Sequence, residues 1–177
     1  MFRRREFTLL SLGSVLLHEG ALAIALDAPN PIEISPLLIT SGQPTPKALA
    51  GLGALGIESV VYLAPSSVTD AVKNEPDLLQ QQGIEFVQIP IPFNAPTEEH
   101  VIAVSKTLQR LSGKRVLVHC QVNLRASTMV FLHRVVTLKE EPSRAYEAVS
   151  RVWSPEGPWR TLVIEQLKKH KVTFELL

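Results

Sequence analysis

The sequence has only one cysteine, Cys120, so no disulfide can form within the chain. Its five histidines and this cysteine show no spacing that is typical of a metal site. Neither of the common glycine-rich nucleotide-binding motifs occurs in the chain. These absences argue against a metalloenzyme and against a nucleotide-dependent enzyme, and the sequence predicts no metal ligands.

A strong net charge and long apolar runs are also lacking. The 18 Lys and Arg residues nearly balance the 17 Asp and Glu residues, for a net charge of +1. This balance gives no support for nucleic-acid binding. Beyond residue 25, no stretch is long and apolar enough to form a stable membrane span. The 177 residues, 45% of them hydrophobic, are enough for one domain with a buried core.

The amino terminus has the order of an export signal. A basic head at residues 3–5 precedes a short apolar run at residues 7–17, and residues 21–23 (Ala-Leu-Ala) offer a small-residue cleavage site. Residues 4–9, Arg-Arg-Glu-Phe-Thr-Leu, resemble a twin-arginine export signal. We therefore expect residues 1–23 to be an export signal and the protein to be periplasmic. The alternative is an amphipathic N-terminal helix on a cytoplasmic protein.

After the export signal and a linker at residues 24–31, the domain at residues 32–177 alternates between predicted strands and helices. Residues 32–34 and 38–39 are predicted to form short extended pieces. Longer strands are predicted at residues 57–63, 84–91 and 115–119. Helices are predicted at residues 46–55, 77–82, 97–111, 126–138, 143–152 and 158–171. This alternation predicts an α/β fold, with a parallel-rich sheet of about four to five strands flanked by helices. Ligands of such sheets gather at the carboxyl ends of the strands.

The surroundings of Cys120 indicate chemistry. The cysteine follows the apolar strand at residues 115–119 directly, and a tight loop leads from it into a helix. Inward-pointing backbone amides of such a loop and the positive end of the helix dipole stabilise a thiolate and grip an anion. Arg125 supplies a fork for two phosphate oxygens. A thiolate held against a bound phosphate is a well-placed nucleophile.

Two neighbours of Cys120 have more than one reading. The strand pleat turns His119 away from the cysteine, and we expect its hydrogen bonds to fix the loop backbone. The alternative is an ordinary buried histidine whose hydrogen bonds are satisfied. The hydroxyl of Ser127 either donates to the thiolate and eases the leaving step, or it bonds to the backbone at the start of the helix.

Together these segments resemble one family. The stretch from His119 to Ser127 resembles the signature of protein tyrosine and dual-specificity phosphatases. The segments Ser41-Gly42-Gln43-Pro44-Thr45 and Ile89-Pro90-Ile91-Pro92, with Trp153 and Trp159, narrow the resemblance. They are similar to a bacterial group of small phosphatase-like domains. This group is related to the beta-lactamase-hydrolase-associated phosphatase-like domains. The resemblance covers about residues 32–171.

The resemblance implies a cysteine-dependent phosphatase that hydrolyses phosphomonoesters through a phosphocysteine on Cys120, with Arg125 and Ser127 as further catalytic residues. It implies a phosphorylated protein or a small phosphoester as substrate, and no cofactor. The substrate-binding residues that it implies are His119, Gln121, Val122, Asn123, Leu124 and Asn94.

The spacing of the loop departs from this signature, which has five residues between cysteine and arginine. Here only four intervene. In one reading the loop is one residue shorter. In the other, the loop keeps its full length, Ala126 stands at the usual arginine position, and Asn123 replaces the common glycine. Arg125 is then rotated by about 100° around the helix from the usual direction.

A proton donor for the leaving group is also missing from its usual segment. Residues 92–96 carry Asn94 where an acid is expected. Glu98, Glu99 and, more weakly, Asp70 are the other candidates. Without an acid, the alternative is a non-catalytic domain that binds phosphoesters or other anions. The four-residue gap also resembles the loop of rhodanese sulfurtransferases, which is a second alternative.

Overall fold

The computed structural model describes residues 26–176, so the predicted export signal at residues 1–23 lies outside the described residues. Its centre is a five-stranded sheet in the order β1-β2-β5-β3-β4. Only β1 is antiparallel to its neighbour, and the other strands are parallel. The strands are β1 (Ile32–Ser35), β2 (Leu38–Ser41), β3 (Ser59–Tyr62), β4 (Glu85–Gln88) and β5 (Val116–His119). The predicted α/β fold with a parallel-rich sheet is confirmed.

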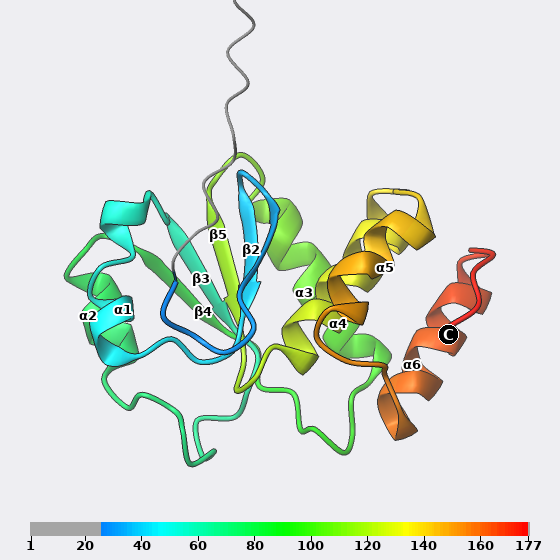
Figure 1. Cartoon of the computed structure of the whole chain (residues 1–177), viewed down its shortest axis with the longest axis horizontal. Helices are drawn as coiled ribbons and strands as arrows, with labels where there is room; N and C mark the ends of the chain where they lie inside the picture. Colours follow the sequence, from blue (N-terminus) through cyan, green and yellow to red (C-terminus); the bar gives the residue numbers. More distant parts are fainter. Residues whose placement is uncertain (1–25, 177) are drawn as a thin grey trace, which may run out of the picture.

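Helices cover both faces of this sheet, as Figure 1 shows. One face carries α1 (Pro46–Leu49), the 3₁₀ turn η1 (Gly53–Leu55) and α2 (Glu75–Gln80). The larger layer holds α3 (Glu98–Arg110), α4 (Leu124–Leu132), α5 (Pro142–Ser150) and α6 (Gly157–Lys169), and α4 continues into a π-helical turn, η2 (His133–Thr137). Between residues 26 and 176, no helix is long and apolar enough to cross a membrane.

The strand pleat divides the core into two clusters. Val60 and Leu117, which are register partners, pack with α1 and α2, whereas Val61 and Val118 pack with the larger helical layer. Because successive side chains of a strand point to opposite faces, continuous apolar strands require helices on both sides. The short strand β5 therefore lies at the centre of the sheet, and this places the loop after it between the two layers.

The predicted helix at residues 46–55 is wrong as one element. It begins as expected, with Thr45 as N-cap accepting from the Ala48 amide at 3.2 Å, but α1 ends at Leu49. The side chain of Gln82 then donates to the Leu49 carbonyl at 2.8 Å and accepts from the Gly53 amide at 2.9 Å. This tertiary contact satisfies the backbone groups that an uninterrupted helix would have paired internally.

The carboxyl ends of β2, β5, β3 and β4 meet at one edge of the sheet, which is the lower edge in Figure 1. Four segments leave this edge: residues 42–45, 63–74, 89–97 and 120–123. Three of them, residues 42–45, 89–97 and 120–123, contain motifs that the sequence singles out. The tertiary fold thus gathers segments that lie far apart in the sequence.

Candidate active site

The loop after β5 turns tightly into α4. Cys120 directly follows the strand with a fully buried side chain, and Asn123 adopts a left-handed backbone conformation, with φ of 74°. The Asn123 amide nitrogen Nδ2 donates to the Asn30 carbonyl at 2.7 Å and to Thr40 Oγ1 at 3.1 Å. Asparagine tolerates this conformation better than other residues with a Cβ, and these two bonds hold it there. Asn123 therefore takes the part that glycine plays in the full-length reading of the loop.

Residues 41–43 pair with the other side of the loop. The Cys120 amide donates to the Ser41 carbonyl at 3.2 Å, and the Gln43 amide donates to the Gln121 carbonyl at 2.9 Å. Between these bonds, Gly42 faces Val122 across an antiparallel bridge. A Cβ on Gly42 would lie 2.6 Å from the Gln121 carbonyl oxygen. Only glycine permits this approach, which explains the glycine of the Ser-Gly-Gln motif.

The amino end of α4 faces the loop with free backbone donors. The first bond of the helix runs from the Ser127 amide to the Asn123 carbonyl at 3.0 Å, so the preceding amides at residues 124–126 have no partner within the helix. Such amides bind anions, assisted by the helix dipole. The Ser127 hydroxyl donates to the Asn123 carbonyl at 2.7 Å. Of the two readings of Ser127, the structure shows the bond to backbone.

Arg125 is buried, with 4% of its surface exposed, and joins the loop to the segment after β4. Its Nε donates to the Ile91 carbonyl at 2.9 Å, and Nη1 donates to Gln121 Oε1 at 3.3 Å. The guanidinium carbon lies 5.1 Å from the centre of the Phe93 ring, within range of a cation–π interaction. These contacts occupy only part of the donor set of the guanidinium, so further N–H groups remain for an anion.

His119 does not bond to the loop backbone, and that expectation is wrong. The pleat turns its side chain toward α2, where Nε2 lies 2.7 Å from Glu75 Oε1. The other oxygen of this carboxylate accepts from Gln43 Nε2 at 2.9 Å, and the imidazole stacks on Tyr62 with 4.7 Å between ring centres. All of these side chains are buried. His119 thus braces the floor of the site and has no exposed surface for a substrate.

Tyr62 lies close to several charged groups of the site. Burial, followed by the negative charges of Glu75, Asp70 and Cys120, raises the pKa of Tyr62 to about 12. Its hydroxyl oxygen is buried and has no hydrogen-bond partner among the described residues. The tyrosine therefore stays neutral at physiological pH.

The remaining predicted binding residues surround the loop. Gln121 is half-buried, and its Nε2 donates to Asp70 Oδ1 at 2.8 Å. The side chain of Val122 is 44% exposed, whereas that of Leu124 is half-buried. Asn94 is exposed on the segment after β4. Of these residues, Gln121 is the one whose side chain hydrogen-bonds to charged groups of the site, Asp70 and Arg125.

The segment at residues 92–96 carries no carboxyl group. Phe93 is fixed there, because its carbonyl accepts from Trp159 Nε1 at 2.8 Å and its ring packs near Trp153 and Trp159. The two tryptophans therefore pack against this segment. Of the two glutamates that follow, Glu98 pairs with Lys169. A hydrogen bond from Thr97 lowers the pKa of Glu99.

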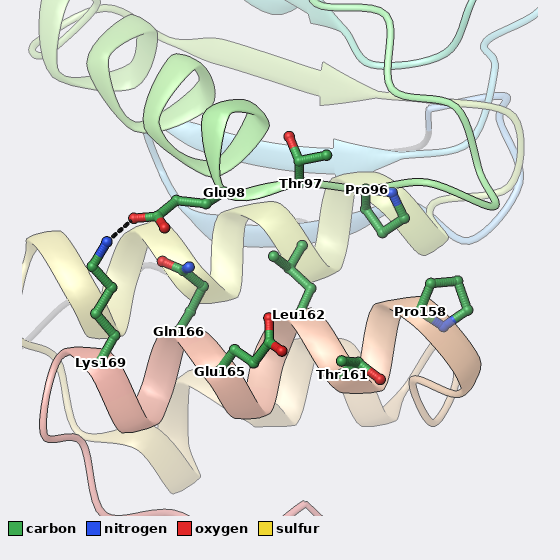
Figure 2. Close-up of a pocket in the computed structure, with 9 residues that line it drawn as sticks. All are labelled: Pro96, Thr97, Glu98, Pro158, Thr161, Leu162, Glu165, Gln166 and Lys169. Carbon is green, nitrogen blue, oxygen red and sulfur yellow. Dashed lines mark hydrogen bonds and ion pairs between the residues drawn. The ribbon is translucent and has the colours of Figure 1, made fainter.

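A groove of about 700 Å³ lies away from this loop, between the start of α3 and α6. Figure 2 shows the ion pair of Glu98 and Lys169 at one end of it and Pro158 toward the other. Apart from Glu98, one of the candidate proton donors, none of the predicted site residues lines it. Residues 26–176 also contain no cluster of His, Cys, Asp or Glu that could hold a metal ion.

Sequence reasoning missed Glu75 and Tyr62 as parts of the site. Glu75 opens α2 before Pro76, where an acidic residue is ordinary at a helix start. Tyr62 reads as one more apolar strand residue. No local pattern marks either residue, because both take part only through the packing of β3 and α2 against β5.

Residues 29–162 match a family described as "DSP-PTPase phosphatase fused to NAD+ Kinase". The chain belongs to this family. It is therefore a member of the superfamily of protein tyrosine and dual-specificity phosphatases, and the predicted family is confirmed. No curated protein matches the chain.

Solved structures of the same superfamily share the fold. A DUF442 protein from Shewanella putrefaciens CN-32, described as a proposed phosphatase, has a TM-score of 0.74 at 28% identity, over 81% of this chain and 94% of its own. Tk-PTP in its active form has a TM-score of 0.63 at 23% identity, over 81% of this chain and 97% of its own. The core catalytic domain of a PP-IP phosphatase from S. cerevisiae, in complex with citrate, has a TM-score of 0.64 at 13% identity, over 83% of this chain and 92% of its own.

Proposed function

We propose that this chain is a cysteine-dependent phosphatase that hydrolyses phosphomonoesters through a phosphocysteine on Cys120. The arrangement of the loop carries this proposal. Cys120 directly follows the central strand, and Asn123 turns the chain so that the first amides of α4 face the same loop. A phosphate bound by these amides would present its phosphorus to the thiolate.

In the first step, Cys120 Sγ attacks phosphorus and forms an S–P bond while the P–O bond to the leaving group breaks. The leaving oxygen takes up a proton. In the second step, water attacks the phosphocysteine, the S–P bond breaks, and phosphate leaves with the thiolate restored. Arg125 would stabilise the phosphate oxygens with its remaining N–H groups, while its bond to the Ile91 carbonyl keeps the side chain in place.

The other predicted residues act around this reaction. Residues 121–124 would bind the phosphate through backbone amides. Ser127 would hold the loop in shape through its bond to the Asn123 carbonyl. Exposed Val122 and Phe93 would contact the organic part of a substrate, with Asn94 beside them at the rim. The substrate class is a phosphorylated protein or a small phosphoester.

Hydrolysis of para-nitrophenyl phosphate by residues 24–177, beside a Cys120→Ser variant, tests the proposal. We expect release of nitrophenol by the wild-type chain, and no release above background by the variant, which keeps its affinity for phosphate. Equal activity of the two proteins would exclude Cys120 as the nucleophile.

A non-catalytic anion-binding domain is the second candidate. The absence of a carboxyl group from residues 92–96 favours it, since that segment lies against Arg125. Vanadate binding without any hydrolysis would support this candidate. Transfer of sulfur from thiosulfate to cyanide would support the sulfurtransferase alternative, to which the family match gives no support.

We further propose that residues 1–23 direct export to the periplasm by the twin-arginine route. The support is the order of the basic head, the short apolar run and the small-residue site. Replacing both Arg4 and Arg5 by lysine should leave the protein in the cytoplasmic fraction of an expressing bacterium. Unchanged export would contradict the proposed route.

A further inference from the structure

The proposed reaction requires a proton at the leaving oxygen, and the usual segment does not supply it. Residues 92–96 carry Phe93 and Asn94 instead of a carboxylic acid. Glu98 is engaged with Lys169, and Glu99 bonds within the first turn of α3. The buried carboxylate of Glu75 already accepts from His119 and Gln43 on the floor of the site. Among the carboxyl groups that the sequence offers as proton donors, Asp70 is the one without such a partner at a helix start.

Asp70 is connected directly to the loop. It lies on the long segment between β3 and α2, which leaves the same edge of the sheet as Cys120 (Figure 1). Its Oδ1 accepts from Gln121 Nε2 at 2.8 Å, and Gln121 Oε1 accepts from Arg125 Nη1 at 3.3 Å. The amide of Gln121 thus joins a carboxyl group to the guanidinium proposed to bind phosphate.

The electrostatics agree with this placement. Asp70 and Cys120 contribute to raising the pKa of Tyr62, and Arg125 contributes to lowering it. Asp70 is also exposed, which leaves it accessible to a bound substrate.

We propose that Asp70 is the general acid of this enzyme, and this inference rests on the proposed phosphatase function. The bond from Gln121 occupies Oδ1, so the acidic proton resides on Oδ2. As the P–O bond breaks, Asp70 gives this proton to the leaving oxygen. The resulting carboxylate then accepts a proton from the water that attacks the phosphocysteine, which restores the acid for the next turnover.

Leaving groups of different basicity test this role. Phenolate is a poor leaving group, because phenol has a pKa of about 10, as tyrosine does. We expect Asp70→Asn to lower kcat for phenyl phosphate by about 10²-fold or more. For 2,4-dinitrophenyl phosphate, whose leaving group is stable as an anion, we expect less than about a threefold change, since little protonation is needed. Asp77→Asn, an exposed aspartate on α2, is the matched control and should change neither value.

A conservative variant gives a second readout. Asp70→Glu, which keeps a carboxyl group, should recover part of the rate for phenyl phosphate that Asp70→Asn loses. Equal losses for both substrates, or no loss for either, would overturn the role of Asp70 while the Cys120→Ser control still upholds the phosphatase. Absence of Cys120-dependent turnover in the wild-type protein would overturn the proposed function, and this inference with it.

Discussion

His119 and Glu75 form a buried pair, with Nε2 of the imidazole 2.7 Å from Oε1 of the carboxylate. The pair joins the end of the central strand β5 to the start of α2. Gln43, from the motif that pairs with the loop, donates to the other carboxylate oxygen. One carboxylate therefore ties together the strand, the helix and the motif that shape the site.

Replacing Glu75 by alanine should destabilise the fold, because it leaves the buried polar groups of His119 and Gln43 without their partner. We expect the free energy of unfolding to fall by about 3 kcal/mol. Glu75→Gln keeps an acceptor at this position and should lose less than half as much. Urea denaturation measures both values, and a Glu75→Ala protein as stable as the wild type would contradict the bracing role of the pair.

Asn123 offers a test of backbone strain at the loop. Asn123→Ala places an ordinary Cβ residue at φ of 74°, whereas Asn123→Gly removes the same side-chain hydrogen bonds without that strain. We expect the alanine variant to be less stable than the glycine variant by about 1 kcal/mol. The comparison of their denaturation midpoints checks this order. The reverse order would show that the loop relaxes to another conformation.

Arg125 should contribute to anion affinity as well as to structure. Arg125→Ala removes charge-assisted hydrogen bonds, and we expect vanadate affinity to fall by about tenfold or more. Arg125→Lys keeps the positive charge but lacks the guanidinium group that also donates to the Ile91 carbonyl. Its vanadate affinity should lie between those of the wild-type protein and Arg125→Ala. Isothermal titration measures each constant. If Arg125→Ala leaves vanadate affinity unchanged but lowers the free energy of unfolding, Arg125 has only a structural role. That role is to hold the loop against residues 91–93.

His133 predicts a stability loss in mild acid. It is buried at the start of the π-helical turn, and burial lowers its pKa below the ordinary value of 6.5, against a smaller opposing effect of Glu140. The unfolded chain therefore takes up a proton below pH 6.5 before the folded chain does, so this group favours unfolding as the pH falls. Stability should decrease from pH 7 toward pH 5 because of this group. His133→Phe should show a smaller decrease, and thermal melts of both proteins across this range check the difference.

The sequence predicted much of the fold because its signals are local. Thr45 and Thr97 cap the helices that follow them, and uninterrupted apolar runs mark buried strands. The predicted helix at residues 46–55 failed because a distant side chain, Gln82, pairs with backbone groups in its middle. Propensity in a short window carries no information about such a partner.

The site shows the same division. The sequence by itself determined the order of strand, cysteine, tight turn and helix, since residue chemistry and spacing fix each of these locally. Only the tertiary structure decided that His119 faces Glu75, that Arg125 reaches the Ile91 carbonyl, and that Gln121 meets Asp70. These partners lie 34 to 51 residues apart in the chain. They meet because parallel strands end at a common edge, and that edge exists only after the sheet has assembled.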